Sequence, residues 1–478
     1  SWSLCNTKFH LQIKPKKKKM TIYNCKTPNL FRIILLLFFS IQSYAQEQIS
    51  LDSTYMRHFK LTREIPYLHL NKTSFMEGEN IWFQAYVLNQ KTNKLHKHTT
   101  NLHCSIYDKN GNFKQSKMLF VKDGLAAGNF KIDSTFTNGT YYIKASTNWM
   151  RNFDEDQSFL QKISIIGNSN IHNKNSNSKN KYNIQLLPEG GHLVENTTSV
   201  VGVIIKNKKN NGVKIKTGVL LDQNNDTVQS FKTNAFGIGK VKFDYIPNTT
   251  YRVRIKTFEG EELEKTLELA KKTGITLNIE SPSSTIFNLT INTNKETVQR
   301  NLNKKFHIYI HNTNSIIRNS FVLKENMHTY KSFLLSNKMP KGVNIITITN
   351  DINIPILERV IFNYDKNLFT RTNSKVISRS RDSLTIELSK NSNNIHYVSA
   401  TFLPEESKSY SLKNTMYSKF LLKPYIKGSI ENSSYYFKNT NKKNCINLWW
   451  SKNIFSFKIN RYEKQRSWYG ASSLETII

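Results

Sequence analysis

The chain has 478 residues, four Cys and a formal net charge of +35, with 69 Lys and Arg against 34 Asp and Glu. At about 100–200 residues per domain, this length predicts three or four domains rather than one. Apolar residues at 38% exclude a chain that is disordered throughout, the few Cys exclude a disulfide-dense scaffold, and a single long apolar run excludes several membrane-spanning helices.

The first feature in chain order is an apolar run over residues 31–41, which is too short to span a bilayer. Small residues at Ser43 and Ala45 follow it, as they do before a cleavage site. We therefore interpret residues 20–45 as a secretory signal peptide, with a retained N-terminal anchor as the alternative. Residues 1–19 are then an upstream segment foreign to the mature protein, and the mature chain is expected to be exported, to the periplasm or the outer membrane.

The positive charge is spread along the whole chain, and no recognisable nucleic-acid-binding module accompanies it. Nucleic acid is therefore not predicted as a partner, whereas a spread positive field favours anionic lipid headgroups or acidic glycans. Only Cys104 and Cys445 follow the cleavage site, and the sequence leaves open whether they pair. Cys104 is expected as a free buried thiol on a strand.

Apolar and polar residues alternate with a period of two in many short segments, which predicts half-buried strands. Four examples are residues 81–87, 252–256, 306–311 and 384–388. Turn signals separate such segments, at residues 108–111, 123–124, 138–139, 211–212 and 341–342. The pattern predicts an all-β chain of tandem antiparallel β-sandwiches, and the best helical candidate is residues 407–419.

A polar Asn/Ser/Lys linker over residues 168–182 divides the chain, and softer boundaries lie near residues 271–274 and 365–367. The predicted blocks are a macroglobulin-like β-sandwich at 46–167, β-sandwiches at 183–272 and 273–366, a partial β-sandwich at 367–445, and an atypical tail at 446–478.

One run in the first block, residues 67–86, carries the most specific motif. A strand ends in Asn71-Lys72, a turn ends in Gly78-Glu79, and a strand with Trp-Phe follows. This run resembles the macroglobulin-type β-sandwich, specifically the second macroglobulin domain, of secreted and outer-membrane bacterial proteins.

Later motifs extend the resemblance over residues 58–445. They include Pro188-Glu189-Gly190-Gly191, and their order resembles the N-terminal periplasmic extension of TonB-dependent-receptor-like outer-membrane proteins. The resemblance implies a plug and a barrel after these domains, but the 33 residues from 446 to 478 are too few for a barrel of at least about eight strands. The chain is thus expected to be truncated before the plug, and transport is not carried over.

The resemblance and the lack of a catalytic constellation imply a non-enzymatic spacer or docking module whose partner is a cell-envelope protein or an outer-membrane channel. Candidate contact residues are Trp82 and Trp149, although packing in the core is the favoured alternative for both. Three other functions remain open. They are a glycan- or peptide-binding module in nutrient capture, a macroglobulin-like protease trap without a thioester, and a non-functional truncated fragment.

Two acidic motifs are interpreted as structural. Glu77-Gly78-Glu79 predicts a turn in which Gly78 takes a positive φ and Glu79 caps the following strand, rather than a catalytic carboxylate pair. In Pro188-Glu189-Gly190-Gly191 the glycines permit a sharp turn, and Glu189 is expected to hold a neighbouring loop by hydrogen bonds.

No metal or cofactor site is predicted. His96 and His98 are expected on one face of a strand, whereas adjacent His103 and Cys104 point to opposite faces, so the four cannot converge on zinc. The carboxylate-rich loops are interpreted as solvated hairpin tips rather than calcium sites, and Gly237-Ile-Gly239 lacks the third glycine of a dinucleotide loop. These loops are residues 154–156 and 222–226.

Overall fold

The structure, a computed structural model, describes residues 60–167, 182–281, 283, 285–312, 315–364, 372–390, 397–407, 409–411, 413–425 and 430–437. Strands dominate this part of the chain and nearly all of their pairings are antiparallel, so the all-β prediction is confirmed. The predicted signal peptide, the segment before it, nearly all of the polar linker, the tail and Cys445 lie outside the described residues.

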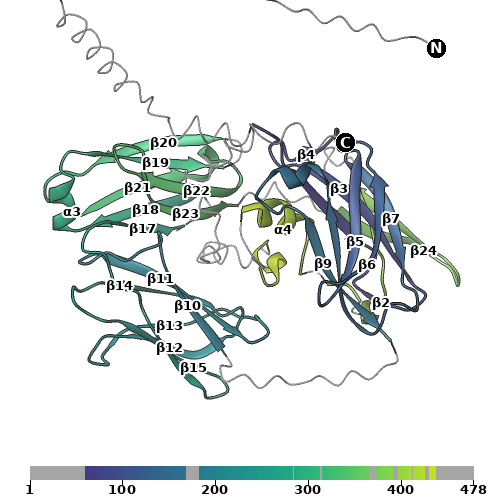
Figure 1. Cartoon of the computed structure of the whole chain (residues 1–478), viewed down its shortest axis with the longest axis horizontal. Coiled ribbons are helices and arrows are strands. Elements are labelled where there is room, and N and C mark those ends of the chain that lie inside the picture. Colours follow the sequence, from purple (N-terminus) through teal and green to yellow (C-terminus); the bar gives the residue numbers. More distant parts are fainter. Residues whose placement is uncertain are drawn as a thin grey trace, which may run out of the picture. The chain divides into compact units, whose positions relative to one another are not determined.

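The first sandwich packs a four-stranded sheet against a five-stranded one (Figure 1). The four-stranded sheet contains β1 (Glu64–Leu70), β3 (Asn80–Asn89), β4 (Lys94–Leu95) and β7 (Leu125–Lys131). The five-stranded sheet has the order β2 (Ser74–Met76), β9 (Phe159–Ile166), β8 (Gly139–Ser146), β5 (Asn101–Asp108) and β6 (Phe113–Phe120), and a 3-10 turn, η1 (Trp149–Asn152), precedes β9.

The alternation in β3 decides which of its side chains enter the core. Ile81, Phe83, Ala85 and Val87 are buried between the sheets, as the period of two predicts. Each large apolar side chain buried in this way contributes about 1.5–3 kcal/mol, so a slip of one residue would expose the whole set. The register therefore directs Trp82, Gln84 and Tyr86 to the outer face.

The second sandwich pairs β10, β11 and β14 in one sheet and β13, β12, β15 and β16 in the other. Their bounds are β10 (Tyr182–Pro188), β11 (Thr198–Asn207), β12 (Ile215–Leu221), β13 (Thr227–Phe231), β14 (Ile238–Asp244), β15 (Arg252–Thr257) and β16 (Glu262–Thr266). Gly237, at φ 68°, lies in the turn before β14, where a Cβ atom would come within 2.2 Å of the Ile205 carbonyl oxygen. The Gly237-Ile-Gly239 motif thus serves a tight turn.

The third sandwich pairs β17, β18 and β21 against β20, β19, β22 and β23. Their bounds are β17 (Ile275–Glu280), β18 (Ile286–Thr293), β19 (Lys305–His311), β20 (Ile316–Val322), β21 (Thr329–Leu335), β22 (Gly342–Thr349) and β23 (Pro355–Asn363), with a turn η2 (Ser336–Lys338). A short helix, α3 (Lys295–Arg300), begins at Asn294, whose side chain accepts a hydrogen bond from the Thr297 amide. The sequence interpretation did not anticipate this helix.

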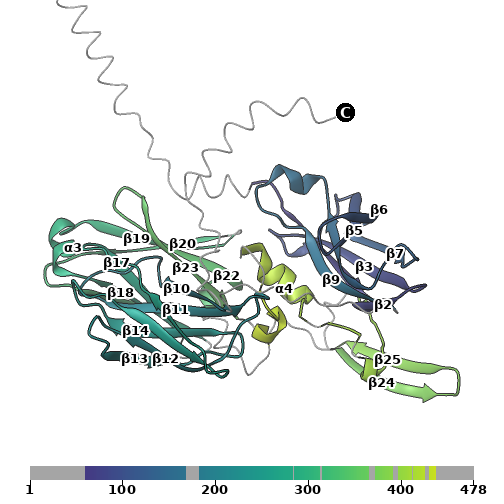
Figure 2. The same ribbon diagram turned by 60° about the horizontal axis from the view of Figure 1, so that its bottom comes forward.

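The fourth block differs from the expected partial sandwich. β24 (Thr372–Arg379) and β25 (Leu384–Lys390) form a hairpin, and no third strand pairs with it within the described ranges (Figure 2). Leu384 and Leu388 alternate as expected, but both are exposed. The alternation of apolar and polar residues predicts a strand, because it depends only on neighbouring residues. It does not predict whether a second sheet covers the apolar side of that strand.

Among the described residues after the hairpin, the regular elements are helical turns and no strand. These are η4 (Glu405–Ser407), α4 (Met416–Leu421), η5 (Lys423–Tyr425) and η6 (Ser433–Phe437). The helix expected at residues 407–419 is therefore shifted toward the C-terminus, because a capping box at Thr415 and Ser418 fixes its start. In the described part of the chain, no helix is long and apolar enough to cross a membrane.

Candidate binding site

The outer face of the four-stranded sheet forms the floor of the candidate site. In the antiparallel register of β1 and β3, Tyr67 lies opposite Tyr86 and His69 lies opposite Gln84. Trp82 lies on the same outer face, because it is separated from Tyr86 by an even number of residues. The floor therefore presents two paired tyrosines with a tryptophan farther along one strand.

A segment from the far end of the chain covers this floor. We call the described residues between 397 and 425 the return segment. The Ser409 carbonyl oxygen accepts hydrogen bonds from the Thr73 amide at 2.8 Å and the Ser74 amide at 3.1 Å. His69 Nδ1 lies 2.6 Å from Ser399 Oγ, and the rings of His69 and Tyr410 meet edge to face. These contacts hold the return segment across β1.

Lys419 anchors the helix of the return segment to the first sandwich. Its Nζ donates to the Gln157 carbonyl at 2.7 Å and to the Ser158 carbonyl at 2.8 Å. Burial, together with the charge of Lys423, lowers the pKa of Lys419 to about 7, although Asp156 opposes this shift. The anchor therefore changes protonation state near neutral pH.

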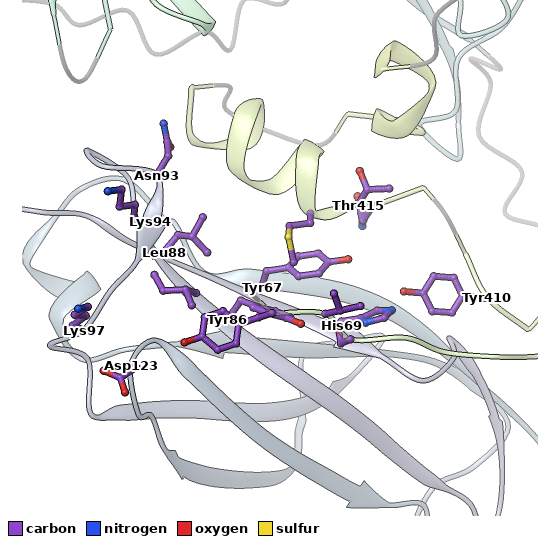
Figure 3. A pocket seen from close by; sticks show the side chains of 16 residues that line it. Tyr67, His69, Tyr86, Leu88, Asn93, Lys94, Lys97, Asp123, Tyr410 and Thr415 are labelled. Atoms are coloured by element: carbon purple, nitrogen blue, oxygen red, sulfur yellow. Dashed lines mark hydrogen bonds between the residues drawn. The ribbon is translucent and has the colours of Figure 1, made fainter. Parts of the chain in front are cut away.

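A cavity of about 1140 Å³ lies between the floor and the return segment (Figure 3). Its tyrosines come from both sides, Tyr67 and Tyr86 from the floor and Tyr397 and Tyr410 from the return segment. None of these four hydroxyl groups forms a hydrogen bond to another described residue. These hydroxyl groups are therefore available to water or to a ligand as donors and acceptors.

The two ends of the cavity differ in charge. Lys94, Lys97 and Asp123 lie at one end in Figure 3, and Tyr410 lies at the other. Burial, and then the neighbouring Tyr410 hydroxyl, raise the pKa of Tyr67, and burial lowers the pKa of His69. The tyrosine end is therefore uncharged at neutral pH, whereas the lysine end carries positive charge.

Both tryptophans that were candidate contact residues are exposed. Trp82 has 57% of its surface exposed and Trp149 has 38%. The favoured expectation that they pack in the core is therefore wrong, because the register turns Trp82 outward and Trp149 lies in η1 outside the sheets. Trp149 Nε1 still donates a hydrogen bond to the Thr62 carbonyl at 2.8 Å, whereas Trp82 presents its ring to solvent.

The turn motif before β3 is closed by side chains. Asn71 Oδ1 accepts a hydrogen bond from the Trp82 amide at 3.1 Å, and Glu79 Oε2 accepts one from the Met76 amide at 2.7 Å. Lys72 Nζ donates to Glu79 Oε1 at 2.5 Å, while Gly78 adopts φ 87°. Burial raises the pKa of Glu79, but these two bonds outweigh it and hold that pKa below its ordinary value.

Replacing Glu79 by alanine is expected to lower the free energy of unfolding by about 1 kcal/mol, because a half-exposed carboxylate loses two hydrogen bonds. The Glu79 carboxylate contributes fully to the free energy of unfolding above about pH 4.3, the ordinary pKa of an unfolded glutamate. This contribution is lost as the pH falls through the lowered pKa of Glu79 in the folded state. Urea unfolding at pH 7 measures the change. Glu77→Ala, on the same turn, is the control, and an equal loss in both variants would contradict the assigned role.

Glu189 connects the second sandwich to the third. Its Oε1 accepts a hydrogen bond from Arg359 Nε on β23 at 2.8 Å and one from the Ile279 amide on β17 at 3.3 Å. Both charged side chains are almost fully buried. Pro188 ends β10, and Gly190 and Gly191 then take φ 83° and 95°, so the glycine pair forms the turn that places Glu189 between the sandwiches. We call Glu189 and Arg359 the interdomain clamp.

Of the histidines considered for zinc, His96 and His98 lie close together, with ring centroids 5.8 Å apart. His96 and His98 follow β4 in a loop rather than sharing a strand face, and His96 Nδ1 lies 2.8 Å from Thr99 Oγ1. Cys104 is buried with a free thiol, whose pKa burial raises to about 12. Among the described residues, no three His, Cys, Asp or Glu side chains are placed to hold a metal ion.

The sequence interpretation missed the cavity tyrosines and Arg359. Tyr67 and Tyr86 belong to the run that carries the resemblance, but nothing in that run shows that a segment some 330 residues away covers them. The alternation of β3 did carry one usable signal, because it places Trp82 and Tyr86 on the face opposite the core.

No protein-family model matches the chain, and no curated protein matches it either. Among solved structures, the native conformation of Escherichia coli alpha-2-macroglobulin aligns at 10% identity over 69% of this chain and 25% of that chain, with a TM-score of 0.19. Dimeric latent PorU from Porphyromonas gingivalis aligns at 10% identity over 69% and 34%, with a TM-score of 0.27. The adhesin FdeC of Escherichia coli aligns at 13% identity over 63% and 98%, with a TM-score of 0.17.

This chain thus spans about a quarter of the alpha-2-macroglobulin and a third of PorU. Such low TM-scores assign no family, and the description as β-sandwiches rests on the sheets themselves.

Proposed function

We propose that the chain is an exported, non-enzymatic array of macroglobulin-type β-sandwiches that serves as a spacer and docking module of an outer-membrane receptor-like system. Its partner is a cell-envelope protein or an outer-membrane channel. The observation that carries this proposal is the exposed apolar edge of the first sandwich, formed by β6. The interdomain clamp supports the spacer role, because it fixes the second sandwich to the third.

β6 is the outer strand of the five-stranded sheet, and its second side pairs with no strand in the described part of the chain. Phe113, Met118 and Phe120 are each more than half exposed along it. An exposed edge strand of this length is a template for an added strand. Lys114 and Lys117 on the same strand disfavour pairing between two copies of β6, since like charges would meet. The edge is therefore better suited to a strand from a different protein.

A photo-crosslinking residue at Met118 is expected to join the chain to an outer-membrane protein, identified by mass spectrometry of the isolated envelope. The same residue at Val228, which is exposed on the edge strand β13 of the second sandwich, is the matched control. A cross-linked outer-membrane protein from Met118 but not from Val228 supports docking through β6. No product from Met118, or the same product from both positions, contradicts it.

A second function, capture of a glycan or peptide, is favoured by the cavity. Such a module needs accessible aromatic residues in one concave patch beside polar groups, and the exposed Tyr397 and half-buried Tyr410, with Lys94, Lys97 and Asp123, favour it. A glycan array separates the two functions, because a specific hit requires a ligand site that a simple spacer lacks.

A further inference from the structure

We infer that the cavity and Trp82 together form a binding track for a short acidic oligosaccharide, with the sugar rings against the aromatic side chains and a carboxylate at Lys94 and Lys97. This inference rests on the second function above, ligand capture, and specifies the chemistry of the ligand.

The aromatic side chains are spaced for an extended ligand. Tyr86 and Trp82 lie four residues apart on one face of β3, a separation of about 13 Å at the usual rise of a strand. Tyr67 lies beside Tyr86 in the neighbouring strand, and Tyr410 adds a ring from the return segment. The accessible rings of Trp82, Tyr397 and Tyr410 can pack against sugar rings, whereas Tyr67 and Tyr86 are 6% and 7% exposed and offer little more than their hydroxyl groups.

The unused hydroxyl groups favour a ligand rich in hydroxyls. A peptide that bound by adding a strand to the sheet would instead need an open row of backbone amides and carbonyls. β3 offers none, because β1 pairs along one side of it and β7 and β4 pair along the other. β3 must therefore recognise its ligand through side chains, and the tyrosine hydroxyl groups, together with Asn93, suit the hydroxyl groups of a saccharide.

Charge determines which saccharide fits. Lys94 and Lys97 form no ion pair with any described residue, and among the described residues that line the cavity Asp123 is the only carboxylate. The chain as a whole is also strongly basic, which attracts anionic ligands from a distance. A uronate unit at the lysine end would supply the missing negative charge and form charge-assisted hydrogen bonds.

Isothermal titration calorimetry of the purified chain tests the inference with tetragalacturonate and tetramannuronate. The methyl ester of tetragalacturonate keeps the rings and removes the charge. We expect both uronates to bind and the ester to bind at least about tenfold more weakly. Tyr67→Phe and Tyr86→Phe, which keep the ring and remove only the hydroxyl, should each weaken binding by about two- to tenfold. Lys94→Ala with Lys97→Ala should weaken uronate binding and leave ester binding unchanged, whereas Lys91→Ala, outside the cavity, should change neither.

Three results would overturn the inference. Equal binding of acid and ester contradicts the acidic ligand but leaves ligand capture standing. Tighter binding of tetraglutamate than of either uronate contradicts a saccharide. Failure of both uronates to bind, with a neutral glycan bound on an array and weakened by Tyr67→Phe, contradicts only the acidic chemistry. A wholly negative array removes ligand capture as well, and cross-linking at Met118 remains an independent test of docking.

Discussion

Replacing Glu189 by alanine is expected to lower the free energy of unfolding of the purified chain by about 3–5 kcal/mol, because the Arg359 guanidinium stays buried without its carboxylate. Arginine cannot lose its proton in this environment, so the folded protein must hold the charge. Urea unfolding followed by circular dichroism measures the loss. Amide exchange at Ile279, whose amide donates to Glu189, should rise first, since that bond is removed directly.

Replacing the other member of the pair, by Arg359→Met, is expected to lower the free energy of unfolding less at low pH than at neutral pH. Burial already raises the pKa of Glu189 above its ordinary value, although Arg359 opposes this, and removing Arg359 raises that pKa further. A carboxyl whose folded-state pKa is raised binds more protons when folded, so the stability of the variant falls as the pH rises above about 4.3. Removing both charges, by Glu189→Leu with Arg359→Met, should cost less than Glu189→Ala alone.

A second ion pair between the same two sandwiches provides the control. Lys242 Nζ lies 3.5 Å from Glu280 Oε1, and both side chains are about half exposed. Glu280→Ala should therefore change stability by no more than about 1 kcal/mol. If Glu189→Ala lowers the free energy of unfolding as little as Glu280→Ala does, the interdomain clamp does not hold the two sandwiches together.

Replacing Lys419 by methionine is expected to remove part of the pH dependence of the free energy of unfolding that the wild-type chain shows. Burial, together with Lys423, lowers the pKa of Lys419 to about 7 in the folded state, whereas an unfolded lysine titrates near 10.4. The unfolded state binds more protons between these values, so stability rises with pH there. Relative to Lys419→Met, the wild type should gain roughly 2–3 kcal/mol between pH 6 and pH 9.

Urea unfolding of both proteins at several pH values measures this gain as a difference, which cancels the other titrating groups. Lys413→Met, at an exposed lysine of the return segment, should retain the wild-type dependence. Amide exchange in α4 reports whether the return segment itself tightens as the pH rises. An identical pH profile for wild type and Lys419→Met would contradict the assignment of the buried ammonium as the titrating anchor.

Much of the fold was predictable because it depends on neighbouring residues. Alternation at residues 81–87 predicted β3 and its inward face, and Asp108 closes the predicted turn by accepting hydrogen bonds from the Asn110 and Asn112 amides. The hairpin β24–β25 shows where this reasoning stops. Local alternation gave its strands, but a sandwich also needs a second sheet, and the following residues have capping and turn signals instead.

The candidate site was less predictable, because its parts meet only in the folded chain. Tyr67 and Tyr86 could be placed in strands, but their pairing depends on the register of those strands. The return segment, which covers both tyrosines, begins more than 300 residues later in the chain. The expectation that Trp82 is buried failed for a different reason, because the local alternation of β3 already placed this residue on the outer face. A large aromatic residue usually fills a core, and only the alternation of β3 reveals that this one points outward.

The order of polar and apolar residues by itself determined that this chain forms antiparallel strands with tight turns, because backbone geometry and side-chain burial act over a few residues. Tertiary structure alone decided that Glu189 meets Arg359 across 170 residues and that Ser399 meets His69 across 330. Hydrogen bonds and ion pairs between such distant positions leave no periodic trace in a sequence, since each needs only one suitable side chain at each end.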